Sequence, residues 1–209
     1  MNTEHLPFPD EGWGYLPPTD DVIRAFQFAR YHYDPKRVLE IGFHLGHSTT
    51  YQLETYNKKS HLVSVSPFID RTGVHKGDFI DPTLRWKMAC TLYDKYKPRW
   101  VWIPGKSHMV RQEIDAYHEA APFDFALVDG GHTYEPASYD MQMCVDFGMK
   151  AFLLDNFELQ PVRNAFNDNP RLKLRKRFFY EQTFKGRTKK NQLAVIEILP
   201  EGVDIDTRV

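Results

Sequence analysis

The stretch Val38–Ser48, with the sequence VLEIGFHLGHS, limits what this chain can fold into more than any other part. It begins with an apolar run that one acid, Glu40, interrupts, and that run is short enough for a buried strand. Gly42 and Gly46 then enclose a tight turn, and Ser48 opens a helical pattern. Glycine lets a ligand approach the backbone closely, and a helix start offers free N–H groups, so this stretch predicts a binding turn. An acid in a buried run needs a donor, which Glu40 is expected to bind.

The spacing of the glycines indicates the ligand. Dinucleotide-binding folds have the pattern G-x-G-x-x-G, whereas this chain has G-x-x-x-G and no third glycine. The pattern V-L-E-x-G-x-x-x-G-x-S resembles the first motif of class I S-adenosylmethionine (SAM) methyltransferases, in particular the metal-dependent O-methyltransferases of the catechol O-methyltransferase type. The resemblance implies that Glu40 and the turn at Gly42 and Gly46 hold the amino-acid end of SAM and that Ser48 contacts its carboxylate. On this motif alone, an ordinary strand-to-helix turn stays open.

Composition excludes several classes of protein. A chain of 209 residues with 42% hydrophobic and 14% aromatic residues is expected to fold as one globular domain. Its net charge of −1 provides no field that would recruit nucleic acid or a membrane. The N-terminus lacks the pattern of a signal peptide, and no apolar run approaches transmembrane length. Cys90 and Cys144 are expected as free thiols in the core, so a cytoplasmic protein is predicted.

Apolar runs alternate with helical patterns along the chain, which predicts five strand–helix units and a terminal hairpin. A helix with Thr19 as its N-cap is expected to run to Tyr33 and to lie ahead of the first strand. The later strands are expected at 61–66, 100–103, 123–129 and 151–154, with helices near 84–96, 110–117, 135–147 and 162–166. Two β-rich runs, 172–182 and 191–199, are joined by the polar segment 184–190 and predict an antiparallel hairpin. The fold class is therefore α/β, a Rossmann-like class I methyltransferase sheet, mostly parallel with a C-terminal antiparallel hairpin.

The predicted organisation is a single methyltransferase domain over residues 1–209. Proline and glycine punctuate residues 1–18, which are expected to form a strap, either covering the active site as a lid or crossing the outer surface. Residues 19–167 form the βα core, and residues 171–199 form the hairpin. The first hairpin strand has four cations at alternate positions, which are expected on one solvated face or on a docking surface for an acidic substrate or nucleic acid: Arg171, Lys173, Arg175 and Arg177.

Oxygen-bearing side chains follow two of the predicted strands. Asp129 ends one strand, and Asp155 and Asn156 end another. The carboxyl ends of parallel strands meet at one edge of a sheet, so these side chains would come together. Oxygen ligands suit a hard cation such as Mg²⁺ or Ca²⁺, and ordinary capping hydrogen bonds are the alternative. The resemblance assigns Asp129, Asp155 and Asn156 as the metal ligands, with Asp129 also bordering the cofactor.

His132 is the predicted catalytic base. It stands three residues beyond Asp129, where the catechol-type enzymes have a lysine base. The run D-G-G-H-T-Y also resembles the D-G-x-H-x-Y signature of a bacterial branch that includes sugar and antibiotic-tailoring O-methyltransferases. An imidazole titrates near the working pH and can accept a hydroxyl proton. The alternative is that His132 only orients Asp129 or a loop backbone.

Three further residues are predicted at the cofactor. Gly105 and Ser107 match the family's G-x-S after strand three, in which the serine lies by the adenine. Strand two departs from the family because it ends in Ser66 instead of the acid that binds both ribose hydroxyls. A serine makes only part of that interaction, which implies weaker SAM binding unless Asp70 reaches in. His44 and His47, spaced as HxxH, are expected to line the cofactor pocket or face solvent, with a zinc site as the weaker alternative.

The sequence therefore predicts a SAM-dependent methyltransferase that acts, with help from a divalent metal, on a hydroxyl oxygen of a small-molecule acceptor. One alternative is a non-catalytic SAM-binding or scaffold protein, which Ser66 suggests. The other is an NAD-dependent oxidoreductase, which the missing third glycine disfavours. The sequence identifies no particular acceptor, and it leaves both a monomer and a homo-oligomer open.

Overall fold

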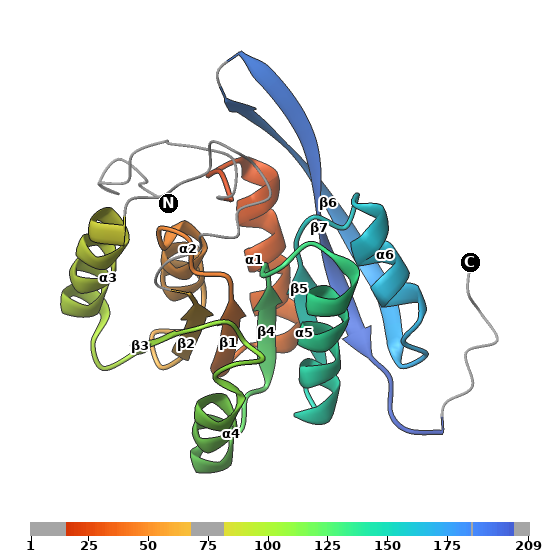
Figure 1. The fold of residues 1–209 in the computed structure, drawn as a ribbon, viewed down its shortest axis with the longest axis horizontal. Coiled ribbons are helices and arrows are strands. Elements are labelled where there is room, and N and C mark those ends of the chain that lie inside the picture. The colour runs from red at the N-terminus through yellow and green to blue at the C-terminus, as the bar shows by residue number, and fades with distance from the viewer. Residues whose placement is uncertain (1–15, 68–81, 185, 203–209) are drawn as a thin grey trace.

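Figure 1 shows the fold in a computed structural model, which describes residues 16–67, 82–184 and 186–202. The helices are α1 (Asp20–Tyr33), α2 (His47–Thr55), α3 (Pro82–Tyr96), α4 (Arg111–Ala120), α5 (Tyr134–Asp146) and α6 (Gln160–Asn167). The strands are β1 (Arg37–Ile41), β2 (His61–Ser66), β3 (Trp100–Pro104), β4 (Phe125–Val128), β5 (Ala151–Leu154), β6 (Leu172–Phe184) and β7 (Arg187–Ile198).

The strands form one seven-stranded sheet in the order β3-β2-β1-β4-β5-β7-β6. The first five are parallel, whereas β7 runs antiparallel to β5 and pairs with β6 as a hairpin. The predicted fold class is confirmed. The chain fills the sheet outward from β1 to β3 and then returns to place β4 beside β1. Open α/β sheets bind ligands outside the carboxyl ends of the strands at such a reversal, so this edge is where a site is expected.

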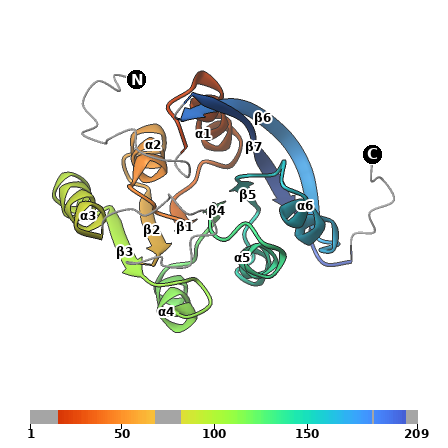
Figure 2. The same cartoon turned by 45° about the horizontal axis from the view of Figure 1, so that its top comes forward.

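Three helices cover each face of the sheet. Figure 2 shows α1, α2 and α3 on one side and α4, α5 and α6 on the other. Successive side chains of a strand point to opposite faces, and the buried residues divide accordingly. Leu127 and Leu153 pack in the core under α1, whereas Val128 and Leu154 pack in the core under α5. Asp129 and Asp155, the next residues along β4 and β5, therefore fall on the α1 face.

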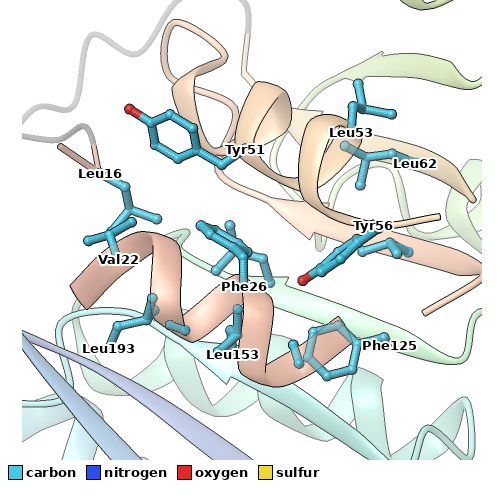
Figure 3. Close-up of a cluster of buried hydrophobic side chains, with 14 of the residues drawn as sticks. Leu16, Val22, Phe26, Tyr51, Leu53, Tyr56, Leu62, Phe125, Leu153 and Leu193 are labelled. Carbon is cyan, nitrogen blue, oxygen red and sulfur yellow. The ribbon is translucent and has the colours of Figure 1, made fainter. Parts of the chain in front are cut away.

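The core under α1 joins elements from both ends of the chain. Figure 3 shows Phe26 of α1 at its centre, with Tyr51, Leu153 and Leu193 around it. The ring of Phe26 lies 6.1 Å from that of Tyr51, in a tilted arrangement. Leu16 is also buried here, which ties the start of α1 to the hairpin. This packing fixes the N-terminal turn of α1 beside the carboxyl ends of the strands.

Most predicted elements are confirmed with small changes in their bounds. The Thr19 side chain accepts a hydrogen bond from the Val22 N–H at 3.3 Å, as the predicted N-cap of α1. Among the described helices, none is long and apolar enough to cross a membrane. Residues 1–15, which make up most of the predicted strap, and Asp70 lie outside the described residues.

Three expectations are wrong. The polar segment 187–190 belongs to β7 and is not part of a loop, because pairs such as Glu181 with Lys190 continue the ladder almost to the turn at Gly186. The four cations of the first hairpin strand do not share a face, because the ladder shifts register between Leu174 and Lys176 and Arg171 precedes β6. Cys144 is buried as expected, whereas Cys90 is exposed on the outer side of α3.

Candidate functional site

The predicted site residues gather at the carboxyl edge of the sheet. β1 and β4 lie side by side there, with Glu40 level with Leu127, and β5 follows β4. The loops after these strands touch, since the Asp129 N–H donates to the Ile41 carbonyl at 2.8 Å. A Cβ on Gly42, whose φ is +106°, would lie 1.8 Å from the Asp129 carbonyl oxygen. Only glycine permits this approach of the two loops, which brings the turn after β1 to the acid that follows β4.

Glu40 is fully buried and is bound by the chain itself. Its carboxylate accepts hydrogen bonds from Ser48 at 2.6 Å, Thr49 at 2.5 Å and Gln52 at 2.8 Å, and a further one from Ser64. Burial raises the pKa of Glu40 to about 7, and these hydrogen bonds oppose the rise. The donor expected for Glu40 thus comes from α2 and β2. Contacts of Glu40 and Ser48 with a cofactor stay predictions, and in this arrangement the Ser48 hydroxyl proton points to Glu40.

The N-terminus of α2 faces the same edge. Gly46, with φ +85°, occupies the N-cap position, where no side chain caps the helix. A Cβ there would lie 2.3 Å from Leu92 Cδ1, so glycine is required by packing against α3. The first N–H groups of a helix have no acceptor within it, and the helix dipole adds partial positive charge. This end of α2 therefore suits a carboxylate such as that of the SAM amino acid.

The two histidines of the turn, expected to line the cofactor pocket or to face solvent, are partly buried at His44 and buried at His47. His47 is 5% exposed, and the Nδ1 atom of His44 is buried. Burial lowers the pKa of His44 to about 3, with further contributions from Arg85 and His47, so the His44 ring is expected to be neutral near pH 7. Among the described residues, no group of three or more His, Cys, Asp or Glu side chains is arranged to bind a metal. The zinc alternative therefore gains no support.

Asp129 and Asp155 lie close together at the strand ends, where each affects the pKa of the other. Asn156 follows Asp155 and its amide lies 3.4 Å from Glu158 Oε1; Asp155 and Asn156 are each 6% exposed. Burial raises the pKa of Asp129 to about 8, and burial together with the charge of Asp129 raises that of Asp155 well above its usual range. The set has two carboxylates and one amide, a donor chemistry that fits a hard divalent cation.

His132 borders this acid pair from the solvent side. Its Nε2 lies 3.6 Å from Asp129 Oδ1, and 42% of its side chain is exposed. Burial against the protein lowers the pKa of His132 from its usual value, and the nearby charge of Asp155 opposes that effect. A ring that is neutral near pH 7 and reaches both solvent and the acid pair is able to accept a proton from a bound molecule.

The terminal hairpin contributes residues that sequence analysis missed. The Tyr180 hydroxyl of β6 donates to Asp155 Oδ1 at 2.7 Å. Glu158 accepts from the Gln192 N–H at 2.8 Å and lies 3.6 Å from the Lys189 ammonium. Tyr180 and Lys189 occur in strand-like runs, and the alternation of those runs gives no sign of these contacts. The contacts depend on the register of β6 with β7 and on the extension of this hairpin past the end of β5.

A hollow of about 580 Å³ opens between the hairpin and the N-terminal turn of α1. Tyr180, whose hydroxyl binds Asp155, is part of its wall, so one residue links the hollow to the acid pair. The other residues that line it are Thr19, Asp20, Asp21, Phe179, Glu181 and Lys190. A volume of this size is sufficient for a small molecule.

On the other side of β1, the predicted cofactor residues of β2 and β3 lie together. The Ser66 carbonyl accepts hydrogen bonds from the Gly105 N–H at 3.0 Å and the Trp102 indole at 3.3 Å. The Ser107 hydroxyl donates to Asp140 of α5 at 2.5 Å, a partner that sequence analysis did not identify. These contacts hold the ends of β2 and β3 at the same edge as α2.

Comparisons with known proteins identify the family and the fold. Residues 39–147 match the model of a family described as a methyltransferase domain. No curated protein sequence matches the chain.

Solved structures with the same fold include several methyltransferases. An O-methyltransferase from Bacillus cereus in complex with SAH (S-adenosylhomocysteine) has a TM-score of 0.62 at 14% identity, covering 90% of this chain and 85% of that one. The O-methyltransferase TomG from Streptomyces achromogenes, involved in tomaymycin synthesis and solved with SAM, has a TM-score of 0.62 at 13% identity, with coverage of 88% and 82%. The SAH-bound methyltransferase PaMTH1 from Podospora anserina has a TM-score of 0.57 at 15% identity, with coverage of 88% and 83%.

Proposed function

The chain belongs to the methyltransferase-domain family and is a SAM-dependent methyltransferase of class I, and from this premise we propose that it methylates a hydroxyl oxygen of a small molecule with the help of a divalent cation. The observation that carries the metal-assisted part is the pairing of Asp129 with the buried Asp155, since the pKa values of both are raised. Two neighbouring carboxyls that resist ionising together would be stabilised as carboxylates by a divalent cation.

Each side chain then has a role that follows from its position. Asp129, Asp155 and Asn156 would hold the cation. His132 takes the proton of the acceptor hydroxyl, since its ring borders the acid pair and stays neutral near pH 7. When bound, SAM supplies a methyl group on a good leaving group, and the cation lowers the pKa of the acceptor hydroxyl and orients it. Alignment of acceptor, methyl and sulfur is then the main contribution of the protein.

The same proposal assigns the cofactor contacts. The N-terminus of α2 binds the SAM carboxylate, with Gly42, Gly46 and Ser48 forming the turn around it. Glu40 supports this turn through Ser48 and Thr49. Ser66 faces the ribose, and Gly105 and Ser107 border the adenine.

For the acceptor, the hollow beside Tyr180 offers a space of sufficient size. Three acids and one lysine line it, which favours a neutral or cationic acceptor over an anionic one. We assign residues 19–167 to the catalytic core, and the hairpin of 171–199 to the acceptor side of it.

The proposal is tested by titrating SAH into the protein with Mg²⁺ and then with a chelator, using calorimetry. Micromolar binding in both buffers, with an added effect of Mg²⁺ when a hydroxyl acceptor is present, is the expected result. Binding of SAH without any effect of Mg²⁺ on turnover would remove the metal from the proposal. Absence of SAH binding would favour the non-catalytic alternative, and Ser66 in place of the ribose-binding acid would explain the loss of binding.

A further inference from the structure

A buried hydrogen bond joins the loop after β3 to α5. The Ser107 hydroxyl donates to Asp140 Oδ1 at 2.5 Å, and the two residues are 8% and 1% exposed. Asp140 lies outside the acid groups described above, and neither methyl transfer nor metal binding as proposed uses it. A carboxyl this deeply buried costs free energy, so its position needs a reason.

Asp140 is fixed in place by its surroundings. A Cβ on Gly130 would lie 2.7 Å from Asp140 Oδ2 and 3.0 Å from Ile41 Cγ2, so the glycine after Asp129 leaves the space that the carboxyl occupies. The Asp140 side chain thus packs between the loop after β4 and the loop after β3. Because the Asp140 carboxyl is held in this space, the Ser107 hydroxyl donates to an acceptor whose position is fixed.

The direction of this hydrogen bond determines what Ser107 can do for a ligand. A carboxylate only accepts, and a serine hydroxyl has one proton and two lone pairs. Burial raises the pKa of Asp140 to about 7, and the hydrogen bond from Ser107 opposes that rise. While Asp140 is ionised, the Ser107 proton is committed to it, and the Ser107 oxygen is left to accept.

We propose that Asp140 is a positioning residue for cofactor specificity, which fixes the Ser107 hydroxyl so that it accepts a hydrogen bond from the 6-amino group of adenine. This inference rests on the proposed function, in which the loop after β3 borders the adenine. A purine with a 6-oxo group presents an acceptor at the same place, and two acceptors without a proton between them repel. The Ser107–Asp140 pair therefore selects adenosine over inosine in the bound nucleoside.

The test compares two ligands, SAH and its 6-oxo analogue S-inosylhomocysteine, by calorimetry about 1.5 pH units above the pKa of Asp140, where its carboxyl is ionised. The wild-type protein is expected to bind SAH at least about tenfold more tightly than the analogue. In Asp140→Ala the hydroxyl is free to donate, so the ratio of the two dissociation constants should fall to about threefold or less. Ser107→Ala should lower the ratio equally, and the double variant should add nothing, since Asp140 acts through Ser107.

Two further variants guard against a purely structural effect. Asp146→Ala removes an exposed acid of the same helix, which accepts from the Gln142 amide at 2.8 Å and lies 3.7 Å from Arg111, and should leave the ratio at its wild-type value. Asp140→Leu fills the space without a polar atom and replaces Asp140→Ala if the latter does not fold. A loss of thermal stability in either Asp140 variant with an unchanged ratio would mean that the pair only holds the loops together.

The outcomes separate this inference from the proposed function. Equal affinity of the wild-type protein for the two nucleosides would overturn the role of Asp140 and leave the methyltransferase assignment intact. A ratio that survives Asp140→Ala or Asp140→Leu would overturn it as well. Failure to bind SAH at all would instead overturn the proposed function, and the inference with it.

Discussion

Glu40 and the pair of Asp129 and Asp155 are carboxyls with little or no exposure at the ends of neighbouring strands on one face of the sheet, yet they are surrounded differently. Glu40 has four side-chain donors, all from α2 and β2. In the part of the chain that the structure describes, the acid pair accepts a side-chain hydrogen bond from Tyr180, and the pKa values of both acids are raised. A carboxyl that the fold satisfies completely supports the fold, whereas a pair that the fold leaves under-satisfied is available to a ligand.

The largest expected effect comes from removing one acid of the pair. Asp155→Ala should lower metal-dependent turnover by about 10³-fold, because the cation loses a ligand and the acceptor loses its alignment. Binding of SAH should change by less than about threefold, since α2 and the glycine turn stay intact. Turnover is measured with and without a chelator, and SAH binding by calorimetry. Full activity of this variant in chelator would show that Asp155 is not a metal ligand.

Replacing Glu40 should lower the stability of the protein, whereas replacing Asp155 should lower its turnover. Glu40→Leu leaves the hydroxyls of Ser48, Thr49 and Ser64 and the Gln52 amide without their acceptor, and should lower the free energy of unfolding by about 3 kcal/mol or more. That corresponds to a fall of roughly 6–12 °C in Tm for a chain of this size. Glu40→Gln is the matched control and should lose less, since hydroxyls can accept from its amide. A thermal stability of Glu40→Leu equal to that of the wild type would contradict the structural role of this cluster.

The same contrast explains what the sequence could predict. The order of strands and helices followed from local periodicity, and the strand-end rule brought Asp129 and Asp155 together without knowledge of any contact. The partners of Glu40, Asp140 and Asp155 could not be predicted, because they come from elements whose approach depends on sheet register and helix packing. Cys90 was misassigned because α3, at the edge of the sheet beside β3, has a wider solvent-exposed face than its pattern suggested.

The acid pair should make the metal-free protein less stable as the pH rises. In the unfolded chain both carboxyls ionise near pH 4, whereas in the folded state the pKa of Asp129 is about 8 and that of Asp155 is also raised. The folded state therefore binds more protons between about pH 4 and pH 8, and its stability falls across that window. We expect a loss of roughly 1–3 kcal/mol between pH 5 and pH 8, measured by denaturant unfolding in chelator.

Two conditions sharpen this result. Asp155→Asn should flatten the fall, and so should Mg²⁺ with the wild-type protein, because each relieves the pair. A smaller slope should remain in both cases, since the pKa of Glu40 is also raised, to about 7. A stability that rises with pH in the metal-free protein would mean that the pair is ionised and stabilised by groups not recognised so far.

The smallest expected effect concerns the donor that the acid pair does have. Tyr180→Phe removes the hydroxyl that donates to Asp155 at 2.7 Å and leaves the ring in the core under α1. Groups that orient a metal ligand typically contribute 10- to 100-fold to metal affinity, so the concentration of Mg²⁺ needed for half-maximal turnover should rise about tenfold. Tyr33→Phe is the control, because it removes a similar hydrogen bond, to Glu197 at 2.9 Å, away from the site. If both variants shift the Mg²⁺ dependence equally, Tyr180 contributes only to packing. If Tyr180→Phe alone shifts it while SAH binding stays constant, the hairpin is part of the site. The acid pair then differs from Glu40, because a residue outside the parallel strands supports it.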